Sequence, residues 1–462
     1  MDGTGFGPRG HALRDKGGPV LAMISWVVIA VLAGTVFWGA NKPEPPAPPP
    51  EKLEALPPPG PLEPIARVIV GAGSLQPKAQ AAALLPMAKM FAGEDQAAAL
   101  RVAILRAELE GPAKGIESID AILKDAPEGS AVVEPARRLR GLLESGPATL
   151  PPDQAEVIRR EHGWLGELAV TIGLDDKDPA RAAIIARAQR SVGAMFVLEV
   201  VLFGGGGLAA LVCAILGVVF LVTGSVRPSL APPAPGGSVF LETFAAFLVA
   251  MALLHLAMPV FQAAMGQWAI LAQWLVAPVA FYPLLRGVPA AQWRFAIGWH
   301  RGRGVLREMC AGVLGYLACA PVVLAGVGLT LLLMAVRAAM SGPVEQPSHP
   351  LGRMLGGATA GQVIALITLA TVWAPVVEET VFRGALYHHL RGRLHWIVAG
   401  LIQAFIFAAI HPQGWMAIPA LGSIGLSFSL LREWRTSLIA PMTAHALNNG
   451  TITLLLLVLF SV

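Results

Sequence analysis

The chain has few charged residues. Only 14% of its 462 residues are charged, against about 25% in an ordinary soluble protein, while 55% are hydrophobic. These proportions exclude a single large soluble domain, a disordered chain and a secreted disulfide scaffold. The charge is also uneven, because residues 66–190 hold 33 of the 64 charged side chains. The rest has the composition of membrane spans, and the net charge of +4 requires no nucleic-acid partner.

Cysteine and aspartate are scarce as well. The three cysteines, Cys213, Cys310 and Cys319, lie in apolar stretches, so we expect small buried side chains rather than a disulfide or zinc framework. No aspartate follows Asp178, which excludes an aspartyl protease site inside the membrane. The sequence also has no His-Glu-x-x-His motif, and no serine is placed to act as a nucleophile with a histidine partner.

Apolar segments long enough to cross a bilayer, about 20 residues, recur along the chain. The first, 19–40, is longer than a signal-peptide core and lacks a small-residue cleavage site, so an uncleaved anchor is favoured over a signal peptide. The fold class predicted is all-α, a polytopic transmembrane bundle of about 8–9 spans with an N-terminal extramembrane helical domain. The later spans are predicted near 193–223, 239–260, 264–285, 309–338, 357–390, 395–411, 415–431 and 437–459.

Two regions separate the first span from the others. Residues 41–65 are nearly half proline and predict an extended linker. Residues 66–190 predict Ala-rich helices of about 12–20 residues divided by Gly and Pro, with a capping loop at Asp175, Asp176 and Asp178. The predicted order is a cytoplasmic N-terminus at 1–18, an anchor at 19–40, a linker at 41–65, an extracytoplasmic α-helical domain at 66–190, a transmembrane segment and loop at 191–234, and an intramembrane domain at 235–462.

The lysine and arginine residues of the short loops predict the orientation. Cytoplasmic loops of membrane proteins are enriched in lysine and arginine. The short loops of this chain show that enrichment if the protein lies in a bacterial cytoplasmic membrane with its N-terminus on the cytoplasmic side. The arginine-rich segment 290–308 predicts an amphipathic helix on the membrane surface, and the short outer loops keep only Arg337 and Arg353. The cytoplasmic side then collects Arg9, Arg14, Lys16, Arg227, Arg286, Arg294, Arg301, Arg303, Arg307, Arg391, Arg393, Arg432 and Arg435.

Ionisable residues inside spans are costly, which makes them functional candidates. Glu378 and Glu379 are adjacent and are followed by Arg383 on one predicted helix. Residues four apart share a helical face, whereas adjacent residues point about 100° apart. We therefore expect Glu379 to pair with Arg383 and Glu378 to turn into a pocket.

Two more pairs have the same spacing of four. Phe407 and His411 lie on the next span, and His445 and Asn449 lie on the last one. At about 1.5 Å per residue from the arginine-rich side, Glu378, His411 and His445 all fall at membrane depth. A single buried site is therefore predicted to contain all three polar side chains.

Such a site has the groups needed to hydrolyse a peptide bond. A glutamate with an adjacent histidine deprotonates water, and His445 with Asn449 supplies donors for the oxyanion. Alternatively, Glu378, His411 and His445 bind zinc, so that the cofactor is either absent or Zn. The candidate catalytic residues are Glu378, Glu379, His411, His445 and Asn449, with Arg383 and Phe407 as structural support.

Two other functions stay open. A proton-coupled transporter would use Glu378, Glu379 and Arg383 as a relay, although no repeated pattern of interrupted spans accompanies them. A non-catalytic immunity or receptor protein would bind a protein partner through residues 66–190.

The three pairs together resemble a known family. Glu378-Glu379-Thr-Val-Phe-Arg383, Phe407-Ala-Ala-Ile-His411 and His445-Ala-Leu-Asn-Asn449 are similar to the motifs of the CAAX protease and bacteriocin-processing (CPBP) intramembrane proteases, also called the abortive-infection family, which include type II CAAX prenyl endopeptidases. The resemblance covers about residues 235–460. It implies an endopeptidase acting on a membrane-associated or lipid-modified, CAAX-like substrate, with water activated by Glu378 and His411 and the oxyanion stabilised by His445 and Asn449. Both metallo and glutamate types are described for the family.

Overall fold

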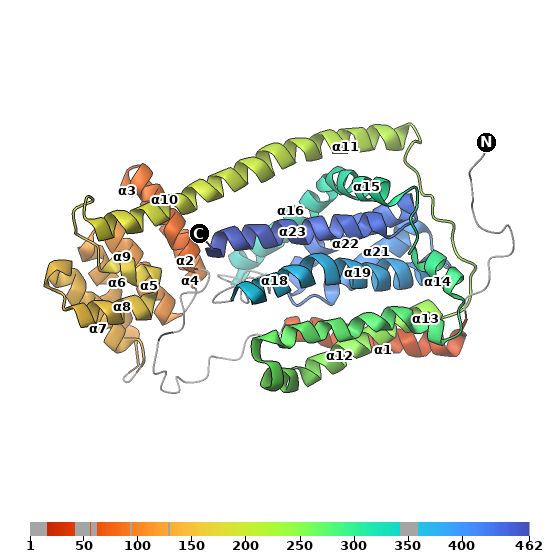
Figure 1. Ribbon diagram of the computed structural model, residues 1–462, viewed down its shortest axis with the longest axis horizontal. Coiled ribbons are helices and arrows are strands. Elements are labelled where there is room, and N and C mark those ends of the chain that lie inside the picture. Colours follow the sequence, from red (N-terminus) through yellow and green to blue (C-terminus); the bar gives the residue numbers. More distant parts are fainter. Residues whose placement is uncertain are drawn as a thin grey trace. The chain divides into compact units, whose positions relative to one another are not determined.

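The computed structural model describes residues 16–41, 56, 62–92, 95–127, 130–341 and 359–461, and every regular element in these ranges is a helix (Figure 1). The predicted all-α class is therefore confirmed. Most of the predicted linker lies outside the described residues, as do Arg9, Arg14 and Arg353. The chain divides into two compact units. The membrane unit comprises Met1–Lys42, Gly206–His349 and Thr359–Thr453, and the helical unit consists mainly of Pro43–Gly205.

Three helices of the helical unit begin at Pro112, Pro152 and Pro179, where the sequence places helix boundaries, but several others are shorter than the 12–20 residues predicted. In these three helices proline occupies the first turn, where its missing N–H costs nothing. Asp178 Oδ1 accepts hydrogen bonds from the backbone N–H groups of Ala180 and Arg181, which confirms the predicted capping loop. The helices are α2 (Leu62–Leu75), α3 (Lys78–Ala82), α4 (Leu85–Ala92), α5 (Gln96–Glu110), α6 (Pro112–Asp125), α7 (Val133–Ser145), α8 (Pro152–His162), α9 (Trp164–Ala169) and α10 (Pro179–Glu199).

The core of the helical unit is apolar and alanine-rich. Ile69 of α2, Leu100 of α5, Ile158 of α8 and Leu165 of α9 are fully buried in one cluster. Small alanine side chains let the short helices pack closely around these larger residues.

The membrane unit contains the long apolar helices. They include α1 (Pro19–Ala40), α11 (Gly207–Val222), α12 (Val239–Met265), α15 (Val305–Ala318), α16 (Ala320–Ser341), α21 (Trp396–Ala409), α22 (Ile418–Arg435) and α23 (Ile439–Ser461). Six helical stretches of the described residues are long and apolar enough to cross a bilayer, and Trp396–Ala409 is a shorter apolar helix. The six are Pro19–Ala40, Pro179–Val222, Val239–Leu285, Ala320–Met340, Ala360–Arg391 and Trp415–Arg435. This number is roughly consistent with the predicted 8–9 spans, since two predicted spans fall within Val239–Leu285.

Local backbone geometry changes two details. The helix predicted over 290–308 is interrupted, because α14 (Ala290–Ile297) ends at Gly298, whose φ of 89° is left-handed. The chain becomes helical again only at Val305. The burial expected for the cysteines is also wrong, since Cys310 is exposed and Cys213 and Cys319 are partly exposed. All three are free thiols.

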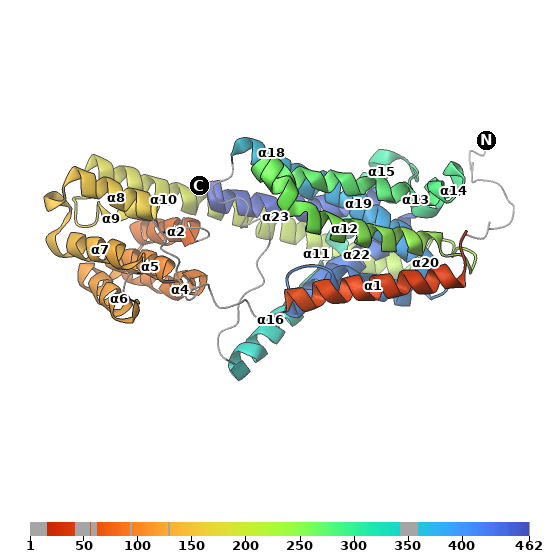
Figure 2. The same cartoon turned by 90° about the horizontal axis from the view of Figure 1, so that it is seen from below.

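A group of aromatic side chains lies in the mostly aliphatic core of the membrane unit. The ring centroid of Phe382 lies 5.0 Å from that of Phe244 on α12 and 5.2 Å from that of Phe407 on α21. Ile29 adds α1 to the same cluster, and Figure 2 shows α1 beside α12. This packing fixes the helix that carries Phe382, which is also the helix of the glutamate pair.

Candidate active site

The glutamate pair lies on a helix whose backbone twice departs from α-helical geometry. The stretch from Ala360 to Arg391 consists of α18 (Ala360–Thr368), a π-helical turn η4 (Leu369–Trp373), α19 (Ala374–Glu379), a second π-helical turn η5 (Thr380–Leu386) and α20 (Tyr387–Arg391). Pro375 in α19 has no N–H for the carbonyl one turn earlier, which favours a wider turn there. Such π-helical turns change which side chains share a face and are frequent at functional sites.

Glu379 is the centre of a buried polar cluster. Its side chain is 0% exposed, and its Oε1 accepts a hydrogen bond of 2.9 Å from Arg383 Nη1. The same oxygen lies 2.8 Å from His445 Nδ1. Because a carboxylate only accepts hydrogen bonds, the histidine donates from Nδ1. The predicted pairing of Glu379 with Arg383 is present, and the contact with His445 joins the first motif to the third.

Arg383 is held by partners on both sides of its guanidinium. Its Nη2 donates to the carbonyl oxygen of Gly425 on α22 at 2.8 Å. Three aromatic rings surround the same group, with centroids 4.8 Å (Phe407), 5.1 Å (Phe428) and 5.8 Å (Phe382) from Cζ. Cation–π contacts of this kind offset part of the cost of burying a charge. Arg383 therefore ties three helices together around Glu379.

Glu378 faces the other side of the same histidine. Its Oε2 lies 4.0 Å from His445 Nε2, while His445 Nδ1 contacts Glu379. The imidazole ring thus lies between two carboxylates on adjacent residues. The Glu378 side chain is 19% exposed and Glu379 is fully buried, so Glu378 is the accessible member of the pair.

His411 lies two residues beyond the end of α21, and a backbone carbonyl of that helix holds its ring. Its Nδ1 lies 2.5 Å from the carbonyl oxygen of Phe407. A carbonyl only accepts, so Nδ1 carries the proton and Nε2 of the neutral ring is an acceptor. The Phe407 ring contacts both histidines, with centroids 4.5 Å from His411 and 6.4 Å from His445. The second motif therefore lies next to the other two.

Asn449 contacts the first π-helical turn. Its Nδ2 donates to the carbonyl oxygen of Ala370 in η4 at 2.9 Å. Asn449 lies one turn after His445 on α23, so both residues of the third motif face the helix of the glutamate pair. The seven candidate residues named from the sequence are thereby brought into one region of the membrane unit.

The structure also adds polar residues that the sequence did not indicate. The hydroxyl of Tyr316 on α15 donates to Asn448 Oδ1 at 2.7 Å, and Asn448 Nδ2 donates to Asn449 Oδ1 at 3.1 Å. On the other side, Trp299 Nε1 donates to Thr380 Oγ1 at 2.9 Å. Tyr316 and Trp299 are far from the motifs in the sequence, and no spacing relates them to the site.

The described residues form no cluster of three metal-binding side chains, since no three His, Cys, Asp or Glu side chains among them are grouped closely enough to hold a metal ion. Nδ1 of His445 is engaged by Glu379 and Nδ1 of His411 by the Phe407 carbonyl, which leaves both Nε2 atoms available as acceptors. The alternative zinc site at Glu378, His411 and His445 is therefore not among the donor groups that the described residues form.

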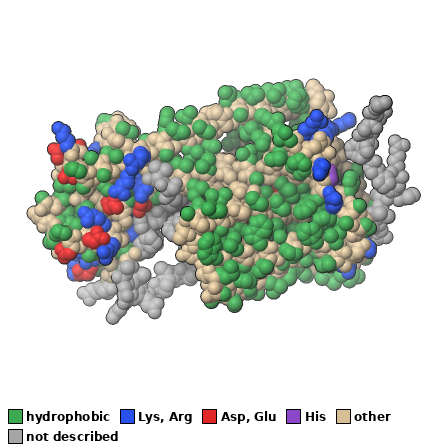
Figure 3. Space-filling model, viewed as in Figure 1, with side chains coloured by type: hydrophobic (Ala, Val, Ile, Leu, Met, Phe, Trp, Pro, Cys, Tyr) green, Lys and Arg blue, Asp and Glu red, His purple; other side chains and the backbone are tan. Residues whose placement is uncertain are grey.

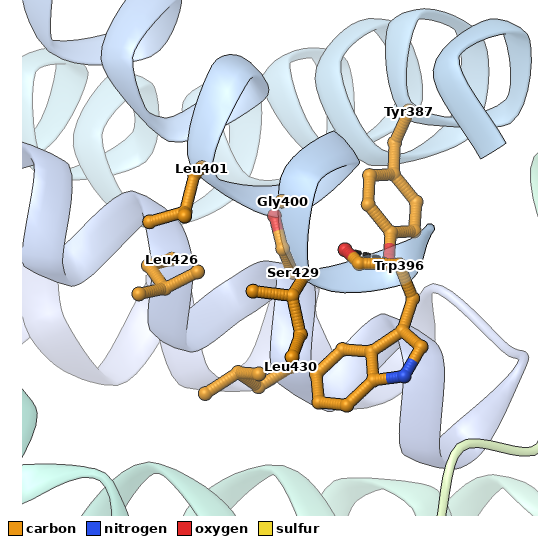
Figure 4. A pocket seen from close by; sticks show the side chains of 8 residues that line it. Tyr387, Trp396, Gly400, Leu401, Leu426, Ser429 and Leu430 are labelled. Atoms are coloured by element: carbon orange, nitrogen blue, oxygen red, sulfur yellow. Dashed lines mark hydrogen bonds between the residues drawn. The ribbon is translucent and has the colours of Figure 1, made fainter. Parts of the chain in front are cut away.

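A separate pocket lies between α20, α21 and α22 (Figure 4). Its volume is about 210 Å³ and its lining is almost entirely apolar. The lining residues are Tyr387, Trp396, Ile397, Gly400, Leu401, Leu426, Ser429 and Leu430. None of the candidate catalytic residues is among them, so the site is defined by the hydrogen-bonded cluster and not by this pocket.

Comparison with known proteins agrees with the motifs. Residues 360–451 match the family model described as type II CAAX prenyl endopeptidase Rce1-like. A curated relative, the membrane-embedded CAAX protease MroQ of Staphylococcus aureus (strain USA300), is 30% identical over 101 residues, which are 21% of this chain. The matched part spans 40% of that relative's length. No solved structure matches the chain. The chain is therefore an integral membrane protein, and its residues 360–451 are similar to Rce1-like type II CAAX prenyl endopeptidases, as the three motifs indicated.

Proposed function

We propose that this protein is an intramembrane endopeptidase that hydrolyses a peptide bond of a membrane-associated or lipid-modified, CAAX-like protein. The observation that supports this most is the His445 ring between the carboxylates of Glu378 and Glu379. Glu378 is the accessible carboxylate beside this ring and can act as a general base, while Glu379 orients the imidazole. The Rce1-like match over the same residues, and the protease named as a relative, support the same activity.

In the proposed reaction, Glu378 takes a proton from the attacking water. His411 assists as an acceptor at Nε2, because its Nδ1 proton is engaged by Phe407. The oxyanion that forms on the scissile carbonyl accepts an N–H from Asn449 and one from His445 Nε2. His445 Nε2 donates there when both ring nitrogens carry a proton, since Nδ1 already donates to Glu379. The proton held by Glu378 then passes to the leaving amine.

We propose that this reaction needs no metal, since the described residues do not group three donors. Activity of the purified protein is therefore expected to persist in excess EDTA and 1,10-phenanthroline. Loss of activity with these chelators, followed by recovery on addition of zinc alone, would show that the site is a metalloprotease site.

The test of the function itself compares the membrane peptidomes of cells with wild-type protein, Glu378→Gln and His411→Ala. General acid–base groups contribute about 10²–10⁴-fold to rate, so cleavage products are expected to disappear in both variants. Glu199→Gln is the matched control, because Glu199 is an exposed glutamate within the candidate span Pro179–Val222 and is not part of the site. If all four proteins produce the same peptides, the protease proposal is wrong.

We further propose a bacterial cytoplasmic membrane location with the N-terminus inside and residues 66–190 outside, where a protein partner binds. Arg294, Arg301, Arg303 and Arg307 are all exposed, and Figure 3 shows basic side chains at one end of the membrane unit. Such enrichment is typical of the cytoplasmic side.

A further inference from the structure

The carboxamide of Asn449 is held at both ends. Its Nδ2 donates to the Ala370 carbonyl at 2.9 Å, and its Oδ1 accepts from Asn448 Nδ2 at 3.1 Å. An NH₂ group has two protons, so one N–H of Asn449 is left for another acceptor. If the amide were turned over, its oxygen would replace that N–H and would repel an oxyanion.

Asn448 needs support of its own to hold Asn449. Adjacent helical residues point about 100° apart, so their side chains do not normally face each other. The support comes from α15, where the Tyr316 hydroxyl donates to Asn448 Oδ1 at 2.7 Å. Because the oxygen end of Asn448 faces the tyrosine, its NH₂ end is the one that faces Asn449. The three hydrogen bonds therefore have one consistent direction, from Tyr316 to Ala370.

Tyr316 also reaches His445, the other proposed oxyanion donor, through the ring of Phe428, which lies between them. Its ring centroid lies 6.1 Å from that of Phe428, and Phe428 stacks on His445 at 5.0 Å with an interplanar angle of 24°. The hydroxyl of Tyr316 thus acts on Asn449 and its ring acts on His445. A single residue of α15 supports both residues of the third motif.

We infer that Tyr316 and Asn448 are positioning residues that set the amide of Asn449 with its free N–H toward the substrate oxyanion. This inference rests on the proposed endopeptidase function. Neither residue touches the reacting atoms; the order of hydrogen bonds from Tyr316 through Asn448 determines which end of Asn449 the substrate meets.

The test measures peptide cleavage by the full-length protein on a substrate identified in the peptidome comparison. Tyr316→Phe removes the hydroxyl and keeps the ring, and Asn448→Asp keeps the acceptor and removes the donor. Both are expected to lower kcat by about 10-fold to 100-fold with little change in KM, because a misplaced catalytic group costs about this much. Tyr282→Phe is the control, because the Tyr282 hydroxyl donates to Glu242 on α12 and not to a residue of the site. Its kcat is expected to equal that of the wild type.

A double variant separates positioning from general destabilisation. If Tyr316 acts only through Asn449, Tyr316→Phe is expected to cause no further loss of kcat in an Asn449→Ala background. Independent losses that multiply, or a wild-type kcat in Tyr316→Phe while Asn449→Ala is impaired, would overturn the inference and leave the proposed function standing. Full activity of Asn449→Ala, or no cleavage by the wild type, would instead contradict the proposed function.

Discussion

Arg383 is a fully buried charge in an apolar segment. Removing an ion from water costs several kcal/mol, and this cost is offset only when partners are well placed. Here the guanidinium donates to Glu379 and to Gly425 and is surrounded by three aromatic rings. A lysine in its place would have one nitrogen to reach both acceptors, so the arginine is specific to the site.

Arg383→Leu is therefore expected to destabilise the membrane unit by about 3–5 kcal/mol, since it leaves the Glu379 carboxylate buried without its cation. Thermal unfolding in detergent, followed by tryptophan fluorescence, measures the effect. The double variant Glu379→Gln/Arg383→Leu removes both charges and is expected to recover part of the stability. Equal stability of wild type and Arg383→Leu would show that the pair is not important for folding.

His162 is a buried histidine of the helical unit. Its side chain is fully buried and, among the described residues, neither ring nitrogen has a hydrogen-bond partner. Burial lowers the pKa of His162 to about 3, and the charges of Arg101 and Arg138 contribute in the same direction. The folded unit therefore keeps this ring neutral at pH values where the unfolded chain binds a proton.

The stability of the helical unit is expected to fall as the pH drops from about 6.5 toward 3, by at most about 1.4 kcal/mol per pH unit. Above pH 6.5 both states are neutral and the penalty vanishes. The measurement is limited proteolysis of the full chain at pH 7 and pH 5, comparing wild type with His162→Phe. The variant is expected to lose less protection on acidification, whereas an identical pH response would rule out His162 as the cause.

At the scale of helices, close approach depends on glycine. A Cβ built on Gly312 of α15 would lie 2.4 Å from the carbonyl oxygen of Ala440 and 2.9 Å from Thr443 Cβ on α23. Small residues at such points let membrane helices pack backbone to backbone. Gly312 lies one turn before Tyr316, so this contact holds the tyrosine near Asn448.

Gly312→Ala is expected to push α15 away from α23 and to destabilise the protein by about 1–3 kcal/mol, as overpacking does. Gly328→Ala on α16 is the matched control, because a Cβ there meets nothing within 4 Å. It is expected to be neutral or slightly stabilising, since Ala favours the helix over Gly. The two melting temperatures provide the comparison, and equal values would contradict the close contact.

For the whole molecule, the distribution of charge predicts which segments face each side of the membrane. The exposed side chains of the helical unit carry both signs, including the Lys114–Glu117 and Arg137–Glu134 pairs. Segment 290–308, by contrast, has exposed arginines and only one acidic residue, the buried Glu308. The latter pattern favours the cytoplasmic side.

The orientation is tested with single cysteines in a chain whose three native cysteines are replaced by serine. In intact cells, Glu117→Cys is expected to react with a membrane-impermeant maleimide, and Arg301→Cys is expected to react only after permeabilisation. The reverse labelling pattern would show that the N-terminus lies outside.

Much of the fold and of the candidate site could be predicted from the sequence, because these features depend on local rules of helix geometry. Span length, the Glu379–Arg383 pair and the capping loop at Asp178 all follow from helical spacing and residue type. The interruption at Gly298 was missed, because arginine periodicity does not report the left-handed conformation of one glycine. Tyr316 and Trp299 were missed because contacts between distant helices have no spacing rule.

The sequence alone determined that the chain is an all-helical membrane protein and which polar residues are candidates, because hydrophobic length and helical periodicity are local properties. Tertiary packing decided how those residues act. It placed His445 between Glu378 and Glu379 and packed three aromatic rings against Arg383. It also brought the hydroxyl of Tyr316 within hydrogen-bond distance of Asn448. Hydrogen bonds are short and directional, so which partners meet depends on the positions of whole helices that no single segment specifies.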